Sequence, residues 1–425
     1  MFRLLPLTAV AFALTLGCRA KQAEDTARAV FGDCDPMVLV PAITGGASVE
    51  ALADPHSDTF GASPEPVRVR YQWPSSDPST SAAFLWATDV DTLATVVEYG
   101  VGDELTERVE GASYRYGGLS DGEGDYRIHE VRLCGLVEPG TTYSYRVGGE
   151  GHWSETYQFT TPGAPGTFDT FRVAISGDSR GAYETWGTLL ATMDSHDPDF
   201  FMFSGDMVEL GVNQYEWDAW FDAAGDLFAR KVMVPAHGNH EFLAVHYFAQ
   251  FALPSPEEWF HIDYGDLTLV SLNDTVRDLE YLDNEQVALI DGAFADNTEG
   301  WRIAMHHQSI YSTCTTHGSY DSLRDIWEPA FDRNDVHLVF AGHNHIYERS
   351  VPIRDGEEVG VDAGTTYFVS GGAGAPLYTG VDKQWFGSVA NPIEHYLIAD
   401  FGPDEVTVTA RDLAGNVLDE FTRSR

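Results

Sequence analysis

The second half of the chain contains five short apolar runs, and a polar residue follows each of them. The runs are residues 171–176, 200–204, 232–237, 301–305 and 338–341. Continuous apolar runs of this length, separated by helix-like segments, are typical of strands that are buried on both faces of a sheet. The pattern therefore predicts a layered α/β domain.

The residues after these runs are rich in metal-binding side chains. They are Gly177-Asp178, Gly205-Asp206, Gly238-Asn239-His240-Glu241, His306-His307 and Gly342-His343-Asn344-His345. Ligands of such sheets gather beyond the carboxyl ends of the strands. One Gly-Asp pair would be an ordinary turn or helix cap, and one His-x-His an ordinary surface loop. The ordered set of five instead supplies the oxygen and nitrogen donors that two neighbouring metal ions require.

Residues 66–162 have a different pattern, with short strands separated by turn residues. Strands are expected at 67–71, 83–87 and 95–99, and Tyr143, Tyr145 and Val147 alternate as in a half-buried strand. This region resembles a fibronectin type III-like sandwich, and Tyr143 is a candidate tyrosine corner. Residues 160–166 read as the linker to the following domain.

The first residues have the layout of an export signal. Arg3 precedes an apolar stretch at 4–16, which is too short to span a membrane comfortably. Residues 14–18 resemble a bacterial lipoprotein cleavage box, so residues 1–18 are expected to be a lipoprotein-type signal segment, with Cys18 as the lipidated first residue of the mature protein; ordinary secretion is the alternative. Residues 19–65 read as a tether. A Cys34–Cys134 disulfide would suit an exported chain, but the sequence does not establish it.

The charge of the chain is strongly acidic. Its 425 residues contain 25 Lys and Arg against 66 Asp and Glu, a net charge of −41. This argues against a nucleic-acid-binding surface, which needs a basic face, although metal ions could still attract a phosphate. Part of the charge lies in the helix-like segment 216–226, whose charged face is expected to be solvated while Trp217, Trp220 and Phe221 point inward.

The order of motifs resembles the calcineurin-like metallophosphoesterase superfamily, and residues 342–349 resemble its purple acid phosphatase branch. The resemblance runs from about Val67 to the C-terminus. It implies a four-layer β-sandwich flanked by helices at 168–425 after the fibronectin type III-like domain. It also implies a two-metal centre that hydrolyses phosphate esters with a metal-activated hydroxide.

The resemblance also implies ligands. Asp178 and His345 would hold the first metal and Asp206 would bridge both. The second metal would be held by Asn239, His307 and His343. His307 is preferred because it stands four residues before Tyr311, as in the family; His306 is the alternative.

Three further residues are candidates for contacting the substrate. His240 matches the family's substrate-contacting histidine, and His317 falls where a histidine helps the leaving group depart, unless it is a solvated loop residue. Arg180 would grip phosphate oxygens or form a salt bridge with a nearby carboxylate.

Two departures leave the metals open. Glu209 stands where purple acid phosphatases have the tyrosine that colours their iron, and Arg180 stands where the wider superfamily usually has a histidine. The first metal would then be completed by water or by Glu209, the protein would be colourless, and the ions would be divalent or mixed-valence Fe, Zn or Mn.

Together these features predict an exported phosphomonoesterase of the cell envelope or the medium. Its partner would be a small phosphate ester, and it would touch a membrane only through an N-terminal lipid. The alternatives are a phosphodiesterase of the same fold and a catalytically weakened binding or adhesion lipoprotein.

Overall fold

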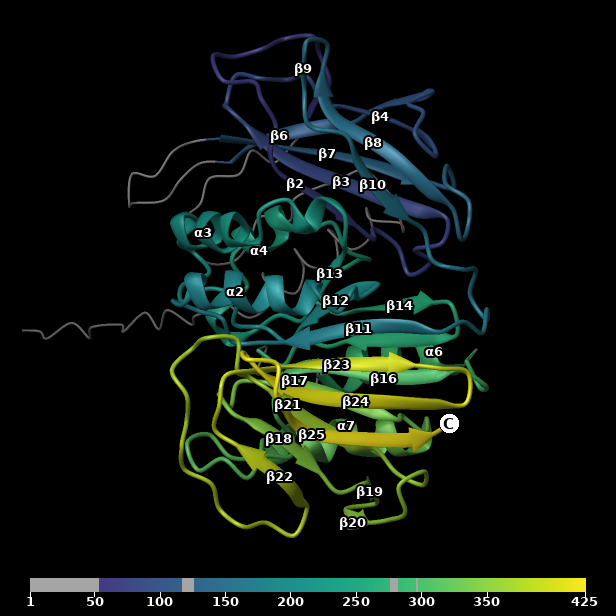
Figure 1. The fold of residues 1–425 in the computed structure, drawn as a ribbon, viewed down its shortest axis with the longest axis vertical. Coiled ribbons are helices and arrows are strands. Elements are labelled where there is room, and N and C mark those ends of the chain that lie inside the picture. Colours follow the sequence, from purple (N-terminus) through teal and green to yellow (C-terminus); the bar gives the residue numbers. More distant parts are fainter. Residues whose placement is uncertain (1–52, 117–125, 276–281, 296) are drawn as a thin grey trace, which may run out of the picture.

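The computed structural model describes residues 53–116, 126–275, 282–295 and 297–425. Its N-terminal part is built from two antiparallel sheets (Figure 1). The first sheet has the order β1 (Asp54–Pro55), β6 (Ala112–Tyr116), β7 (Tyr126–Cys134), β3 (Ser81–Thr88), β2 (Val67–Gln72). The second has the order β10 (Tyr157–Thr160), β8 (Thr142–Gly149), β4 (Val96–Val101), β5 (Glu107–Glu110), and β9 (His152–Trp153) pairs with β8.

The remainder of the chain forms two larger mixed sheets. The six-stranded sheet has the order β13 (Met233–Pro235), β12 (Phe200–Phe203), β11 (Phe171–Ser176), β23 (His395–Phe401), β24 (Glu405–Asp412), β25 (Val417–Ser424). The seven-stranded sheet has the order β14 (Phe260–Tyr264), β15 (Leu267–Ser271), β16 (Trp301–Gln308), β17 (Leu338–Gly342), β21 (Thr366–Ser370), β18 (Tyr347–Ser350), β22 (Gly387–Asn391). A small hairpin pairs β19 (Ile353–Arg354) with β20 (Glu357–Glu358).

Helices cover the outer faces of these two sheets. One group lies toward the N-terminal sandwich and comprises α2 (Tyr183–Asp194), α3 (Gln214–Ala224), α4 (Val245–Gln250) and the short turns η1 (Leu227–Ala229) and η2 (Asn239–Glu241). The other group lies against the seven-stranded sheet and comprises η3 (Leu282–Gln286), α6 (Val287–Ala295) and α7 (Asp321–Arg333). Figure 1 shows α3 and α4 between the sandwich and the β11–β12 sheet.

The predicted fold class is confirmed: two mixed sheets flanked by helices follow an all-β sandwich. The apolar runs coincide with strands that pair in parallel. These are β11, β12 and β13 in one sheet and β15, β16, β17 and β21 in the other. Parallel strands buried on both faces need apolar side chains on both faces. The expected tyrosine corner is also present, since the Tyr143 hydroxyl accepts a hydrogen bond from the Glu138 N–H at 2.8 Å.

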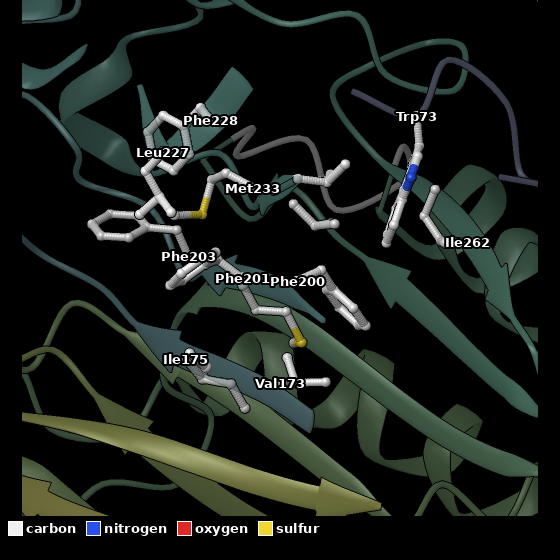
Figure 2. Packing of buried hydrophobic residues seen from close by; sticks show 14 of the residues in the cluster. Trp73, Val173, Ile175, Phe200, Phe201, Phe203, Leu227, Phe228, Met233 and Ile262 are labelled. Carbon is white, nitrogen blue, oxygen red and sulfur yellow. The ribbon is translucent and has the colours of Figure 1, made fainter. Parts of the chain in front are cut away.

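One apolar core runs through both parts of the chain. Figure 2 shows Phe200 and Phe203 of β12 between Val173 of β11 and the Leu227–Phe228 turn. The same cluster reaches Trp73, whose ring lies 5.2 Å from that of Phe200. The N-terminal sandwich therefore shares buried surface with the sheets that carry the predicted metal site.

The expectations for residues 1–18 and 19–52 lie outside the described residues. Cys134 is disulfide-bonded, and its expected partner Cys34 also lies outside them, while Cys314 is a free, buried thiol. Within the described ranges, no helix has the length and apolar character needed to cross a membrane.

Candidate metal centre

The strand ends bring the predicted ligands to one place between the two large sheets. Asp178 and Asp206 follow β11 and β12, and Asn239 opens η2 after β13. His307 lies near the end of β16, and His343 follows β17 directly. Since the strands of each set run in parallel, their carboxyl ends share one edge, which is why residues far apart in sequence meet there.

The first group consists of Asp178, Asp206 and His345. One donor atom from each lies within 4.8 Å of the others, and all three side chains are buried. The Nδ1 of His345 lies 2.7 Å from the carbonyl oxygen of Pro376, so a proton on Nδ1 leaves the Nε2 lone pair free. That Nε2 lies 3.4 Å from the Oδ1 of Asp178, which is the arrangement of a metal-ligating histidine held by an outer carbonyl.

The second group consists of Asp206, His307 and His343. The Nε2 of His307 lies 3.2 Å from the Asp206 Oδ1 and 3.1 Å from the Asn239 Oδ1. It also lies 3.2 Å from the Nδ1 of His343. The His307 Nδ1 bonds the Ser204 carbonyl at 2.7 Å, so two imidazole nitrogens and two oxygens face one point. A cation suits this donor set, because one ion can accept lone pairs from all four atoms.

Asp206 belongs to both groups and is the shared carboxylate that a two-metal centre needs. Burial alone would raise its pKa, but the adjacent His307 outweighs burial and lowers the pKa of Asp206 well below its usual range. Burial would lower the pKa of His307, and the Asp206 carboxylate reverses this and raises it to about 10. Without metal, His307 therefore carries a proton that a bound cation would have to displace.

The backbone of three candidate ligands is strained. Asp178, Asp206 and His343 have φ values of 61°, 56° and 66°, in the left-handed region that costs a residue with a side chain on the order of 1 kcal/mol or more. The buried carboxylate of Glu241 accepts the N–H groups of Asp206 at 2.9 Å and Met207 at 2.8 Å. Glu241 thus fixes the turn that presents Asp206, although the sequence motif that contains Glu241 did not indicate a role for it.

The structure places His307 in the cluster and turns His306 away from it. A bulge in β16 between Met305 and Gln308 leaves both histidines out of the regular ladder. Asp274 fills the gap: its Oδ2 accepts the His307 N–H at 3.0 Å and lies 3.2 Å from the His306 Nδ1. His306 is therefore a support for the bulge.

Arg180 adopts the salt bridge that the sequence left open. Its Nη1 lies 2.6 Å from the Glu209 Oε2, and its Nε lies 3.6 Å from the Asp206 Oδ2. Glu209 is half exposed and directed at Arg180, and the two ligand groups do not include it. His240 joins this side of the site, with its Nε2 4.0 Å from the Asp206 Oδ2.

His317 lies on the other side of the cluster and is exposed. Its ring centroid is 4.2 Å from that of the ligand His343. Burial and then the nearby His345 lower its pKa. Tyr378 closes this side, because its ring stacks on His345 at 4.2 Å and its hydroxyl lies 3.4 Å from the His317 Nε2.

The sequence reading missed four residues that shape this site: Glu241, Asp274, Tyr320 and Tyr378. Asp274 had a usable signal, since it follows the apolar run of β15 as the other strand-end residues follow theirs. Tyr320 contacts the His343 Nε2 at 2.7 Å, but neither it nor Tyr378 follows an apolar run. No periodic pattern could have found those two.

Two family models match the chain. The calcineurin-like phosphoesterase model matches residues 171–347, and the model of the purple acid phosphatase N-terminal domain matches residues 66–161. The chain thus carries a calcineurin-like phosphoesterase domain, and this class of domain implies a centre of two metal ions. Together with the match of the N-terminal domain and the similarity to purple acid phosphatases, this confirms the predicted resemblance to the purple acid phosphatase branch.

The chain is similar to purple acid phosphatase 22 of Arabidopsis thaliana, with 30% identity over 286 residues. The match covers 62% of this chain and 62% of that protein, so the chain spans less than two thirds of its relative. The fold is similar to that of purple acid phosphatase PPD1 from yellow lupin seeds, with a TM-score of 0.75 and 20% identity over 85% of this chain and 74% of that one. PhoD has a TM-score of 0.61 and 15% identity over 86% and 90%.

Proposed function

We propose that this protein hydrolyses phosphate monoesters at a two-metal centre. Asp178, Asp206 and His345 would hold one ion, and Asp206, Asn239, His307 and His343 would hold the other. The observation that carries the proposal is the position of Asp206, which is the one carboxylate that lies in both donor groups. Two cations held by these residues would acidify a water and neutralise charge on the attacking and leaving oxygens.

In this proposal, Arg180 and His240 bind the phosphate group. The guanidinium and the imidazole both approach the Asp206 Oδ2, at 3.6 and 4.0 Å. A planar guanidinium can hold two phosphate oxygens at once. Binding the phosphate on this side would leave its ester oxygen directed away from Asp206.

In this proposal, His317 protonates the leaving oxygen. It is exposed, so a substrate can reach it, and it lies 4.2 Å from His343 between ring centroids. The hydroxyl of Tyr378 near its Nε2 would orient the ring. General acid catalysis of this kind is typically worth about 10²–10⁴-fold in rate.

The metals and the location of the protein form part of the same proposal. Imidazole with carboxylate and amide oxygens accommodates Zn, Mn or Fe, and the glutamate at position 209 gives no phenolate to favour ferric iron. We also propose that residues 1–18 direct export, with Cys18 as a lipid attachment site.

The test is hydrolysis of p-nitrophenyl phosphate and of its bis ester by full-length protein loaded with Zn, Mn or Fe. The proposal expects the parent protein to turn over the monoester and His343→Ala, which lacks a metal ligand, to lose this turnover. His261→Ala is the matched control, since it removes a partly exposed histidine of β14 outside the site.

Each outcome decides between the functions. Preference for the bis ester would make the protein a phosphodiesterase of the same fold. No turnover of either ester with any of the three metals would favour a binding protein that has lost catalysis. Full activity in His343→Ala would show that the residues assigned here do not hold the metals.

A further inference from the structure

Helix α3 lies between the N-terminal sandwich and the metal-centre loops and contacts both. On its sandwich side, Arg68 of β2 reaches Asp222 with its Nε at 2.8 Å and Asp218 with its Nη1 at 3.0 Å. The Tyr126 hydroxyl adds a bond to the Asp218 Oδ1 at 3.2 Å. The sequence predicts that the charged face of this helix is solvated. In the structure, Arg68 of the N-terminal sandwich binds this face instead.

The opposite face of α3 holds the two aspartate loops. The Trp220 indole N–H donates to the Ser179 Oγ at 2.9 Å, and that hydroxyl bonds the Met207 carbonyl at 3.0 Å. The Trp217 indole N–H donates to the Gly211 carbonyl at 2.8 Å. With 3.6 residues per turn, positions 217 and 220 face away from positions 218 and 222. The same part of α3 therefore contacts the sandwich on one face and the aspartate loops on the other.

These loops need an external support. Asp178 and Asp206 have φ values of 61° and 56°, and strained backbone persists only where the surroundings hold it. Ser179 follows the first aspartate and Met207 follows the second, so the Trp220–Ser179–Met207 chain ties both strained turns to a single helix. Both tryptophans are fully buried, which leaves the helix little freedom to shift.

We propose that the N-terminal sandwich is a working part of the metal centre: through Arg68 and α3 it positions the loops that carry Asp178 and Asp206. In this arrangement Arg68, Trp217 and Trp220 are positioning residues that touch neither metal nor substrate. The inference rests on the metal centre proposed above and does not depend on which ester the site hydrolyses.

The test is the affinity of the full-length protein for Zn²⁺, measured by competition with a chromophoric chelator. Arg68→Ala is expected to weaken binding of the more weakly held ion at least five-fold. Arg68→Lys, which keeps the charge, is expected to recover most of this loss. Trp220→Phe, which removes the indole N–H but keeps an aromatic ring, is expected to weaken binding similarly.

The matched control is Tyr114→Phe. It removes a bond of the same domain interface, from the Tyr114 hydroxyl to the Ala249 carbonyl at 2.7 Å, and it leaves the contacts of α3 intact. Its Zn²⁺ affinity is expected to stay within twofold of the parent. Should Arg68→Ala not fold, Asp222→Asn breaks the same pair from the exposed side of α3.

Three results would overturn the inference. They are an unchanged affinity in both Arg68→Ala and Trp220→Phe, an equal loss in Tyr114→Phe, and a parent protein that binds no Zn²⁺. A parent that binds two ions with the expected variant pattern but hydrolyses no ester would refute the proposed function and leave the positioning role standing.

Discussion

The guanidinium of Arg180 and the carboxylate of Glu209 form an ion pair of 2.6 Å beside Asp206, the carboxylate shared by both candidate metal groups. Glu209 stands where the purple acid phosphatases that this chain resembles have an iron-binding tyrosine. In this protein the Glu209 side chain neutralises Arg180 instead. A phosphate that binds Arg180 must therefore compete with this carboxylate.

Removing the negative charge at position 209 should tighten phosphate binding. In Glu209→Gln, we expect the KM for p-nitrophenyl phosphate and the inhibition constant of inorganic phosphate both to fall about three-fold or more, in line with the modest worth of a partly exposed ion pair. Steady-state kinetics with Glu357→Gln, an exposed glutamate of β20, as the control would check this. A higher KM in Glu209→Gln would mean that Glu209 helps Arg180 to bind the ester.

Placing a phenol at the same position should give the protein colour. Glu209→Tyr loaded with ferric iron is expected to show a visible charge-transfer band, while the parent protein loaded in the same way stays colourless. The absorption spectrum measures this directly. An equally strong band in the parent would point to another phenolate, and Tyr378, which stacks on His345, would be the first to examine.

The role of His317 predicts a dependence on the leaving group. His317→Ala should lower kcat for an alkyl phosphate about 10²-fold or more, and much less for p-nitrophenyl phosphate, whose phenolate leaves without a proton. The ratio of the two kcat values separates proton donation from simple damage to the site. Equal losses with both esters would assign His317 to binding alone.

Asp274 supports the bulge of β16, so weakening this residue should lower the affinity of the protein for metal. Asp274→Asn keeps the shape of the side chain but weakens the acceptor that holds the His307 N–H at 3.0 Å. We expect Zn²⁺ binding to fall about ten-fold, which is the usual scale for groups that orient a metal ligand. Asp291→Asn, the same change at a partly exposed aspartate of α6 that pairs with Arg333, is the control for charge and shape.

The domain interface predicts a stability that falls as the pH rises. Burial raises the pKa of Asp218 to about 6 and that of Glu257 to about 8. Because both groups keep their proton to a higher pH in the folded than in the unfolded chain, the folded state binds more protons and unfolding becomes easier from about pH 4 to pH 8. Thermal melting of Glu257→Gln against the parent over this range should show a flatter pH dependence; parallel curves would contradict it.

Much of the ligand set could be predicted because each ligand follows a buried strand. The apolar runs mark strands, and parallel strands of one sheet share an edge, so Asp178 had to approach Asp206 and His307 had to approach His343. The sequence could not predict whether Arg180 binds phosphate or pairs with a carboxylate. Arg180 and Glu209 lie in loops after different strands, and only the fold brings these loops together. Asp218 and Asp222 looked solvated because nothing local reveals an arginine that arrives from β2.

The shared core around Trp73 and Phe200 has a consequence for how the chain comes apart. Cutting the 160–166 linker should leave two fragments that stay associated, because their separation would expose aromatic surface on both. Calorimetry should then show a single cooperative melting transition. The sandwich and the phosphoesterase domain would then unfold together as one thermodynamic unit.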